Sequence, residues 1–117
     1  MLTPKFLLHL EGIVVAAAAT IAYHHAGCSW LWFAVLFLAP DASALGYAAG
    51  PRTGAATYNL AHTYAVVALI WVAGHGLHWA GTTPACLIWL AHIGADRAPG
   101  FGLKYPSAFQ DTHLAEV

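Results

Sequence analysis

The chain has 117 residues, of which 60% are hydrophobic and only 8% are charged, against about 25% charged in ordinary soluble domains. Its formal net charge is −1 with neutral histidines, so it has no basic field to attract nucleic acid, and its two cysteines are too few for a disulfide framework. This composition favours one integral membrane domain over residues 1–117, with the lipid bilayer as its solvent.

Four apolar segments predict four membrane-spanning helices, at about 6–25, 29–49, 57–77 and 84–98. A helix needs about 20 residues to cross the hydrocarbon, so the first three are long enough and the fourth is short. The first is interpreted as a retained helix rather than a cleaved signal, because Glu11 interrupts its apolar run. Connectors are expected at 26–28, at 48–56 ("AGPRTGAA" and its flank) and at 74–84, and a polar tail at 99–117.

The basic residues predict the orientation of these helices. Lys5, Arg52, Arg97 and Lys104 are the only Lys and Arg residues, and a four-pass chain places all of them on the side of both termini. The positive-inside rule then predicts an all-α, four-helix transmembrane bundle with both termini in the cytoplasm.

Each predicted helix carries polar side chains near its cytoplasmic end. At about 1.5 Å of rise per residue, one acidic or histidine side chain of each helix lies about 8–12 Å from that end. The motifs "LAHTY" and "LAHIG" supply the two histidines. This polar layer consists of Glu11, Asp41, Asn59, His62, His92 and Asp96. Ionised groups in lipid are costly, so the layer is expected to face the bundle interior, with its members paired.

Imidazole and carboxylate groups together predict a divalent metal site, because zinc, iron and manganese all accept these ligands. The predicted metal ligands are Asp41, His62 and His92; the predicted catalytic groups are Glu11, Asp96 and Arg97; and the predicted substrate-side or supporting groups are Asn59, Lys104, Asp111 and His113. Two other interpretations remain open: a metal-free polar site for catalysis or proton transfer, and a hydrogen-bond network that holds the helices together.

The pattern favours a metal-dependent membrane hydrolase that takes a lipid-like or amphipathic substrate from the inner leaflet. The alternatives are a proton-coupled or small-solute transport protein, which could be a homo-oligomer, and a non-catalytic membrane scaffold. The pattern leaves open whether the protein is an enzyme at all.

A second group of histidines and cysteines lies at the opposite ends of the helices. Its members are His24, His25, Cys28, His75, His78 and Cys86. These residue types suit copper or zinc, but short His/Cys tracts in loops are weak indicators of a metal site.

Three stretches resemble a known family: "LEG" at 10–12, "FLAPDASALGYAAGPRTGAATYNLAHTY" at 37–64 and "WLAHIGADRAPGFGLKYPSAFQDTHL" at 89–114. They are similar to small bacterial membrane proteins grouped as domain of unknown function 4260. The resemblance implies a four-helix integral protein of the bacterial inner membrane, and it brings no established activity. The family's motif matches all ten predicted site residues and none of the second group of histidines and cysteines.

Overall fold

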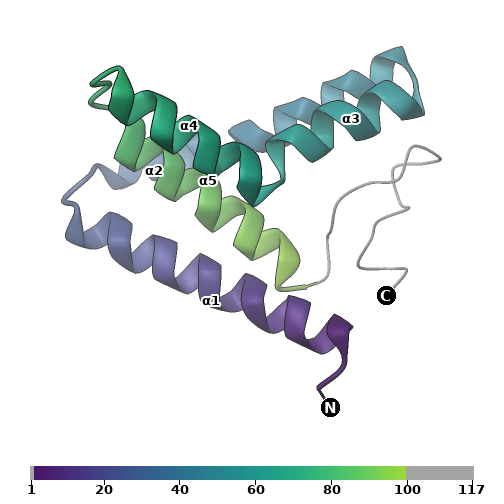
Figure 1. Ribbon diagram of the computed structural model, residues 1–117, viewed down its shortest axis with the longest axis horizontal. Coiled ribbons are helices and arrows are strands. Elements are labelled where there is room, and N and C mark those ends of the chain that lie inside the picture. The colour runs from purple at the N-terminus through teal and green to yellow at the C-terminus, as the bar shows by residue number, and fades with distance from the viewer. Residues whose placement is uncertain (1, 100–117) are drawn as a thin grey trace.

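The structure is a computed structural model that describes residues 2–99, and this part of the chain is helical, without strands (Figure 1). The elements in chain order are α1 (Pro4–His25), α2 (Trp30–Leu36), the 3-10 helix η1 (Ala39–Ala49), α3 (Pro51–Ala61), α4 (Tyr64–Gly76) and α5 (Thr82–Arg97). The predicted all-α class is confirmed. The division into elements differs from the four predicted helices.

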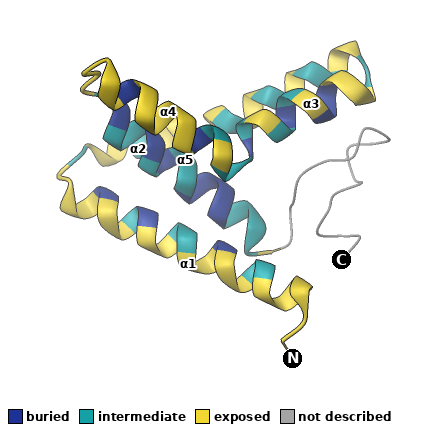
Figure 2. Ribbon diagram, in the orientation of Figure 1, coloured by how far each residue is buried: buried dark blue, intermediate teal, exposed yellow. Residues whose placement is uncertain are grey.

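Helix α5 is the central element of the described fold. It packs against α1 on one side and α4 on the other, and Figure 2 shows most of its residues as buried or intermediate. The core cluster joins Cys86 and Ile93 of α5 to Val67 of α4. Long apolar side chains on α1, α2 and α4 are instead exposed, as expected for helices whose outer faces contact lipid.

Two glycines bring the backbones of α1 and α5 into contact. A Cβ atom on Gly94 would lie 2.6 Å from the backbone nitrogen of Ala16 and 2.7 Å from the carbonyl oxygen of Gly12. A Cβ atom on Gly12 would lie 2.5 Å from Cβ of Arg97. Small residues at such crossings allow the close helix packing that is common in membranes.

The predicted helix over 29–49 is divided at Pro40. Helix α2 ends at Leu36 and η1 begins at Ala39. Proline has no N–H to donate and disfavours α-helical geometry in the residue before it, so a continuous α-helix ends ahead of Pro40. The chain continues as a 3-10 helix, and Ser43 Oγ donates a hydrogen bond to the Pro40 carbonyl at 2.6 Å.

The predicted connector at 48–56 is wrong over most of its length, because only Gly50 separates η1 from α3. Gly50 has a φ of 118°, a conformation that favours glycine, and Pro51 is well suited to the first helical position. η1 and α3 therefore form an antiparallel hairpin, in which Thr57 Oγ1 donates to the Ser43 carbonyl at 2.8 Å. In Figure 1 the α3 arm extends to the upper right, away from α1.

The predicted helix over 57–77 is broken at His62 and Thr63. The chain bends by 54° between α3 and α4. The backbone of Thr63 at this bend is extended, with φ −111° and ψ 137°. The break lies at the polar site, because His62 is one of the residues of that site.

The described helices indicate association with a membrane. Pro4–His25 and Trp30–Ala49 are each long and apolar enough to cross one, and α3 with α4 forms a third span if the bent pair counts as one. Helix α5 has 16 residues and does not reach this length. Length and composition thus support two or three crossings among residues 2–99, whereas the prediction was four.

Candidate metal centre

Four polar side chains from three elements converge on one point. Asp41 comes from η1, His62 follows the last residue of α3, and His92 and Asp96 lie one turn apart on α5. One ligand atom from each residue lies within 4.8 Å of every other. We call this group the four-residue cluster. The equal depth of these residues in the predicted helices indicated that they would meet.

The separations within the cluster have the size expected around a small cation. Nε2 of His62 lies 3.2 Å from Asp41 Oδ1 and 3.4 Å from Asp96 Oδ2. Nε2 of His92 lies 3.1 Å and 3.2 Å from the same two oxygens, and the two Nε2 atoms are 3.1 Å apart. A metal bound tetrahedrally at about 2.0–2.2 Å separates its ligand atoms by about 3.3–3.6 Å. Five of the six separations therefore lie within a few tenths of an ångström of those in a tetrahedral site, and the sixth, between the two aspartates, is no more than 4.8 Å.

The cluster is buried on its histidine side and open on its aspartate side. His62 and His92 are 3% and 1% exposed. The side chain of Asp96 is 26% exposed, and that of Asp41 is 51% exposed. A molecule approaching the cluster would therefore meet Asp41 first.

The ring of His62 is oriented by Tyr58, one turn earlier on α3. His62 Nδ1 donates to the Tyr58 carbonyl at 2.8 Å, and the two rings stack with centroids 3.7 Å apart. Because a carbonyl can only accept, Nδ1 carries the proton, and in neutral His62 the lone pair lies on Nε2, inside the cluster. A ring N–H donated to a backbone carbonyl is the usual way in which proteins orient a metal-binding histidine.

The same hydrogen bond accounts for the end of α3. In a continuous helix the Tyr58 carbonyl would accept from the backbone N–H of His62. Here the ring Nδ1–H of His62 donates to the Tyr58 carbonyl. The backbone N–H of His62 donates instead to the Asn59 carbonyl at 3.2 Å. His62 leaves helical geometry, with φ −118° and ψ 19°. Competition of a side chain for a backbone carbonyl weakens a helix locally.

Two side chains of α5 hold the broken end of α3 in place. Trp89 Nε1 donates to the Ala61 carbonyl, and Arg97 Nη2 donates to the His62 carbonyl at 3.2 Å. Both carbonyls would otherwise lack a partner at a helix end. Trp89 and Arg97 lie before and after His92 along α5, so they hold His62 opposite His92.

His92 is positioned by packing. Its ring meets the edge of Phe37 at 5.1 Å between centroids, at the junction of α2 and η1. Its Nδ1 is buried and has no hydrogen-bond partner among residues 2–99. Asp96 follows at i+4, so both side chains project from one face of α5.

The cluster brings together more hydrogen-bond acceptors than donors when both histidines are neutral and both aspartates are ionised. With both histidines neutral, the lone pair of His62 Nε2 and the two carboxylates share at most one proton, on His92 Nε2. Converging acceptors without donors are costly inside a protein. An imidazolium, a protonated carboxyl group or a bound metal ion would balance the cluster, and a metal ion at the centre would satisfy all four ligand atoms at once.

The remaining predicted site residues lie outside the cluster. Glu11 is exposed on α1, and Asn59 is partly buried one turn before His62. The Arg97 guanidinium lies 5.1 Å from the centroid of the Tyr64 ring, and no ion pair joins it to a carboxylate within the described residues. Lys104, Asp111 and His113 lie outside the described residues.

Sequence reasoning missed the supporting side chains Tyr58 and Trp89. Tyr58 lies four residues before His62, a spacing that places both on one helix face. Trp89 lies three residues before His92, but nothing in the sequence indicates that its N–H would reach Ala61.

The second group of histidines and cysteines does not assemble into a metal site. Across residues 2–99 the four-residue cluster is the only group with metal-binding geometry. Cys86 is buried in the core beside Val67, away from solvent.

Comparison with known proteins places the chain in a family. No curated protein and no solved structure matches it. The family model described as domain of unknown function (DUF4260) matches residues 5–117, a range that contains the four-residue cluster and all the other predicted site residues. The chain therefore belongs to the DUF4260 family, as its three motif stretches predicted.

Proposed function

We propose that the four-residue cluster binds one divalent metal ion and that the protein is a metal-dependent membrane hydrolase. The observation that carries the metal site is the convergence of four ligand atoms, with five of their separations between 3.1 and 3.4 Å. Two imidazole nitrogens and two carboxylate oxygens suit zinc, iron or manganese.

The division of roles follows burial. His62, His92 and Asp96 form the inner ligand set, and Asp41 is the exposed fourth ligand. Catalytic metal sites keep a position for water or substrate, whereas structural sites are closed by four protein ligands. Exchange of Asp41 for water would open such a position and leave a carboxylate beside it as general base. A metal bound here would supply a Lewis acid and a water activated at neutral pH.

Four helical crossings with both termini in the cytoplasm support access from the inner leaflet. This topology adds α5 as a fourth crossing to the two or three spans that helix length supports. The short α5 would cross the membrane surrounded by other helices that cover its polar end. All four Lys and Arg residues then lie on the cytoplasmic side. The partners we propose are the lipid bilayer of a bacterial inner membrane and an amphipathic substrate.

Metal analysis of the purified protein in detergent tests this function. We expect about one zinc, iron or manganese ion per chain in the wild type and a loss of most of it in His62→Ala, because a buried ligand is removed. His75→Ala is the matched control, since His75 is exposed and its ring bonds only the Trp71 carbonyl of its own helix.

Asp96→Asn provides a second ligand variant that keeps the side-chain size, and circular dichroism would establish that each variant is folded. Equal metal content in the His62→Ala and His75→Ala proteins would place the ion elsewhere. A wild type that stays metal-free after incubation with each of the three ions would leave the cluster as a polar network joining the helices.

A further inference from the structure

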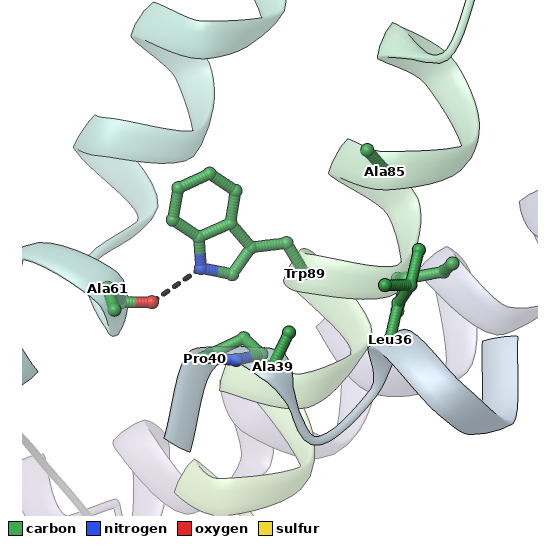
Figure 3. Close-up of a pocket in the computed structure, with 7 residues that line it drawn as sticks. Leu36, Ala39, Pro40, Ala61, Ala85 and Trp89 are labelled. Carbon is green, nitrogen blue, oxygen red and sulfur yellow. Dashed lines mark hydrogen bonds between the residues drawn. The ribbon is translucent and has the colours of Figure 1, made fainter. Parts of the chain in front are cut away.

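An apolar cavity of about 310 Å³ lies between the ends of α2 and α3, the start of η1 and one face of α5, and Figure 3 shows the side chains that line it. They include Leu36, Pro40, Ala61, Ala85, Ile88 and Trp89. This volume lies at the lower end of the roughly 300–1,000 Å³ typical of ligand pockets.

The cavity offers an occupant almost no hydrogen bonds. The one side-chain N–H in its lining, on Trp89, already donates to the Ala61 carbonyl, as Figure 3 shows. The indole therefore presents ring carbons to the cavity. A peptide segment would bring backbone N–H and C=O groups that find no partner here, at a cost of several kcal/mol per group in a membrane. A hydrocarbon chain brings none.

Some residues that line the cavity are neighbours of cluster residues in the sequence. Pro40 directly precedes Asp41, and Ala61 directly precedes His62. Ile88 lies one helical turn before His92, on the same face of α5. Two of the four cluster residues, Asp41 and His62, thus directly follow residues that line the cavity, and His92 lies one helical turn from a third lining residue. None of the four cluster residues lines the cavity itself, so a ligand in the cavity reaches the cluster only if its end extends beyond the lining residues.

We propose that this cavity holds the acyl chain of a single-chain amphiphile, with its carboxylate or ester head group at the four-residue cluster. The assignment of the head group rests on the proposed metal site. The acyl chain is favoured by the apolar walls and by the position of Leu36 and Pro40 near the middle of the candidate span Trp30–Ala49, where the surrounding solvent is hydrocarbon.

Photolabelling of the metal-loaded wild-type protein tests the proposal. The probe is a medium-chain fatty acid with a diazirine at its methyl end, and mass spectrometry maps the labelled residues. We expect labelling in the segments 36–40 and 85–89. Ala85→Trp should reduce it by about tenfold or more, because the indole fills the volume that the chain would occupy. Ala85→Leu should reduce it less and serves if the larger variant does not fold.

Ala68→Trp is the matched control, because Ala68 lines a separate apolar cavity of about 370 Å³ between α4 and α5. It should leave both labelling and metal content at the wild-type level. Removal of the metal with a chelator should weaken labelling of the wild type, since the carboxylate loses its partner.

The outcomes separate the acyl site from the metal site. Undiminished labelling in a metal-loaded Ala85→Trp protein would overturn the acyl site and leave the metal centre standing. Labelling that Ala85→Trp blocks, but that is the same with and without metal, would support the acyl cavity and overturn the placement of the head group. Competition by a two-chain phospholipid as strong as that by unlabelled fatty acid would overturn the assignment to a single-chain ligand.

Discussion

His62 links the local fold to the candidate chemistry. Its ring N–H satisfies the Tyr58 carbonyl, which ends α3 and at the same time directs Nε2 toward His92 and the two aspartates. The break in the helix and the orientation of the ring are therefore one structural event. A change that restored a straight helix here would also turn the ring away from the cluster.

Arg97 acts on the cluster through His62. Its guanidinium donates to the His62 carbonyl and lies against the Tyr64 ring, so its described contacts support the start of α4. We therefore treat Arg97 as a positioning residue. Its predicted role as a catalytic group that receives an anionic head group stays a prediction.

Arg97→Gln should lower metal affinity without abolishing the site. Loss of an outer contact that orients a ligand commonly costs about 10–100-fold in metal affinity, and we expect a loss of this size. Titration against a chromophoric chelator would measure it, and stoichiometry at saturating metal should be unchanged. Arg52→Gln, exposed at the start of α3, is the control. Equal affinities in the two variants would contradict the positioning role.

At the level of elements, α5 determines where the other helices lie. It contributes two of the four cluster residues, and its Trp89 and Arg97 capture the end of α3. On its opposite side, Gly94 allows α1 to pack at backbone contact. His9 Nδ1 of α1 bonds the Ala98 carbonyl just beyond the end of α5, at 2.8 Å. Helix α1 thus stabilises the helix that carries the cluster without entering it.

Gly94→Ala should destabilise the protein by about 1–3 kcal/mol, because the added methyl group would overlap backbone atoms of α1 that cannot rotate aside. Thermal unfolding in detergent, followed by circular dichroism, would show this as a lowered Tm. Gly76→Ala is the matched change, since a Cβ atom there has no neighbour within 4 Å. It should be neutral or slightly stabilising in a helix. A Tm for Gly94→Ala as high as that for Gly76→Ala would refute the close crossing.

At the scale of the whole molecule, apolar side chains are exposed on the outer helix faces, while the histidine side of the polar cluster is buried. Large apolar residues cover the outer faces of α1, α2 and α4, while His62 and His92 are buried. This distribution has a physical reason, because ionisable groups in hydrocarbon must be paired inside the bundle.

Thiol labelling of intact cells would test the proposed orientation. A membrane-impermeant maleimide should label Cys28, which lies between α1 and α2 on the proposed outer side and is partly exposed. Cys86 is buried and should stay unlabelled, which makes it an internal control. In a Cys28→Ser background, Lys104→Cys should be labelled only after the membrane is permeabilised. Labelling of that cysteine in intact cells would reverse the orientation.

The sequence by itself was enough to predict the helical class, the family and a six-residue polar layer that contains the four residues that meet, although Glu11 of that layer is exposed outside the cluster. Composition and apolar segment length are local properties, and the equal depth of Asp41, His62 and His92 followed from helical rise alone. Pro40 also gave a local reason to expect a kink in the second predicted helix, and the structure divides that helix into α2 and η1. The role of Gly50 and Pro51 as a tight turn could have been read from their order, but the second glycine, Gly54, suggested a longer connector, whereas it lies inside α3 against Tyr47.

Only the tertiary structure decided how the cluster is held. The end of α3 depends on Trp89, 28 residues from Ala61, and on Arg97, 35 residues from His62. A histidine ring can bond a carbonyl of its own helix, and the helix can end there if other groups bond the remaining free carbonyls. Here the partners come from another helix, so periodicity along α3 cannot reveal the break. The apolar cavity likewise exists only because three distant segments leave that space between them.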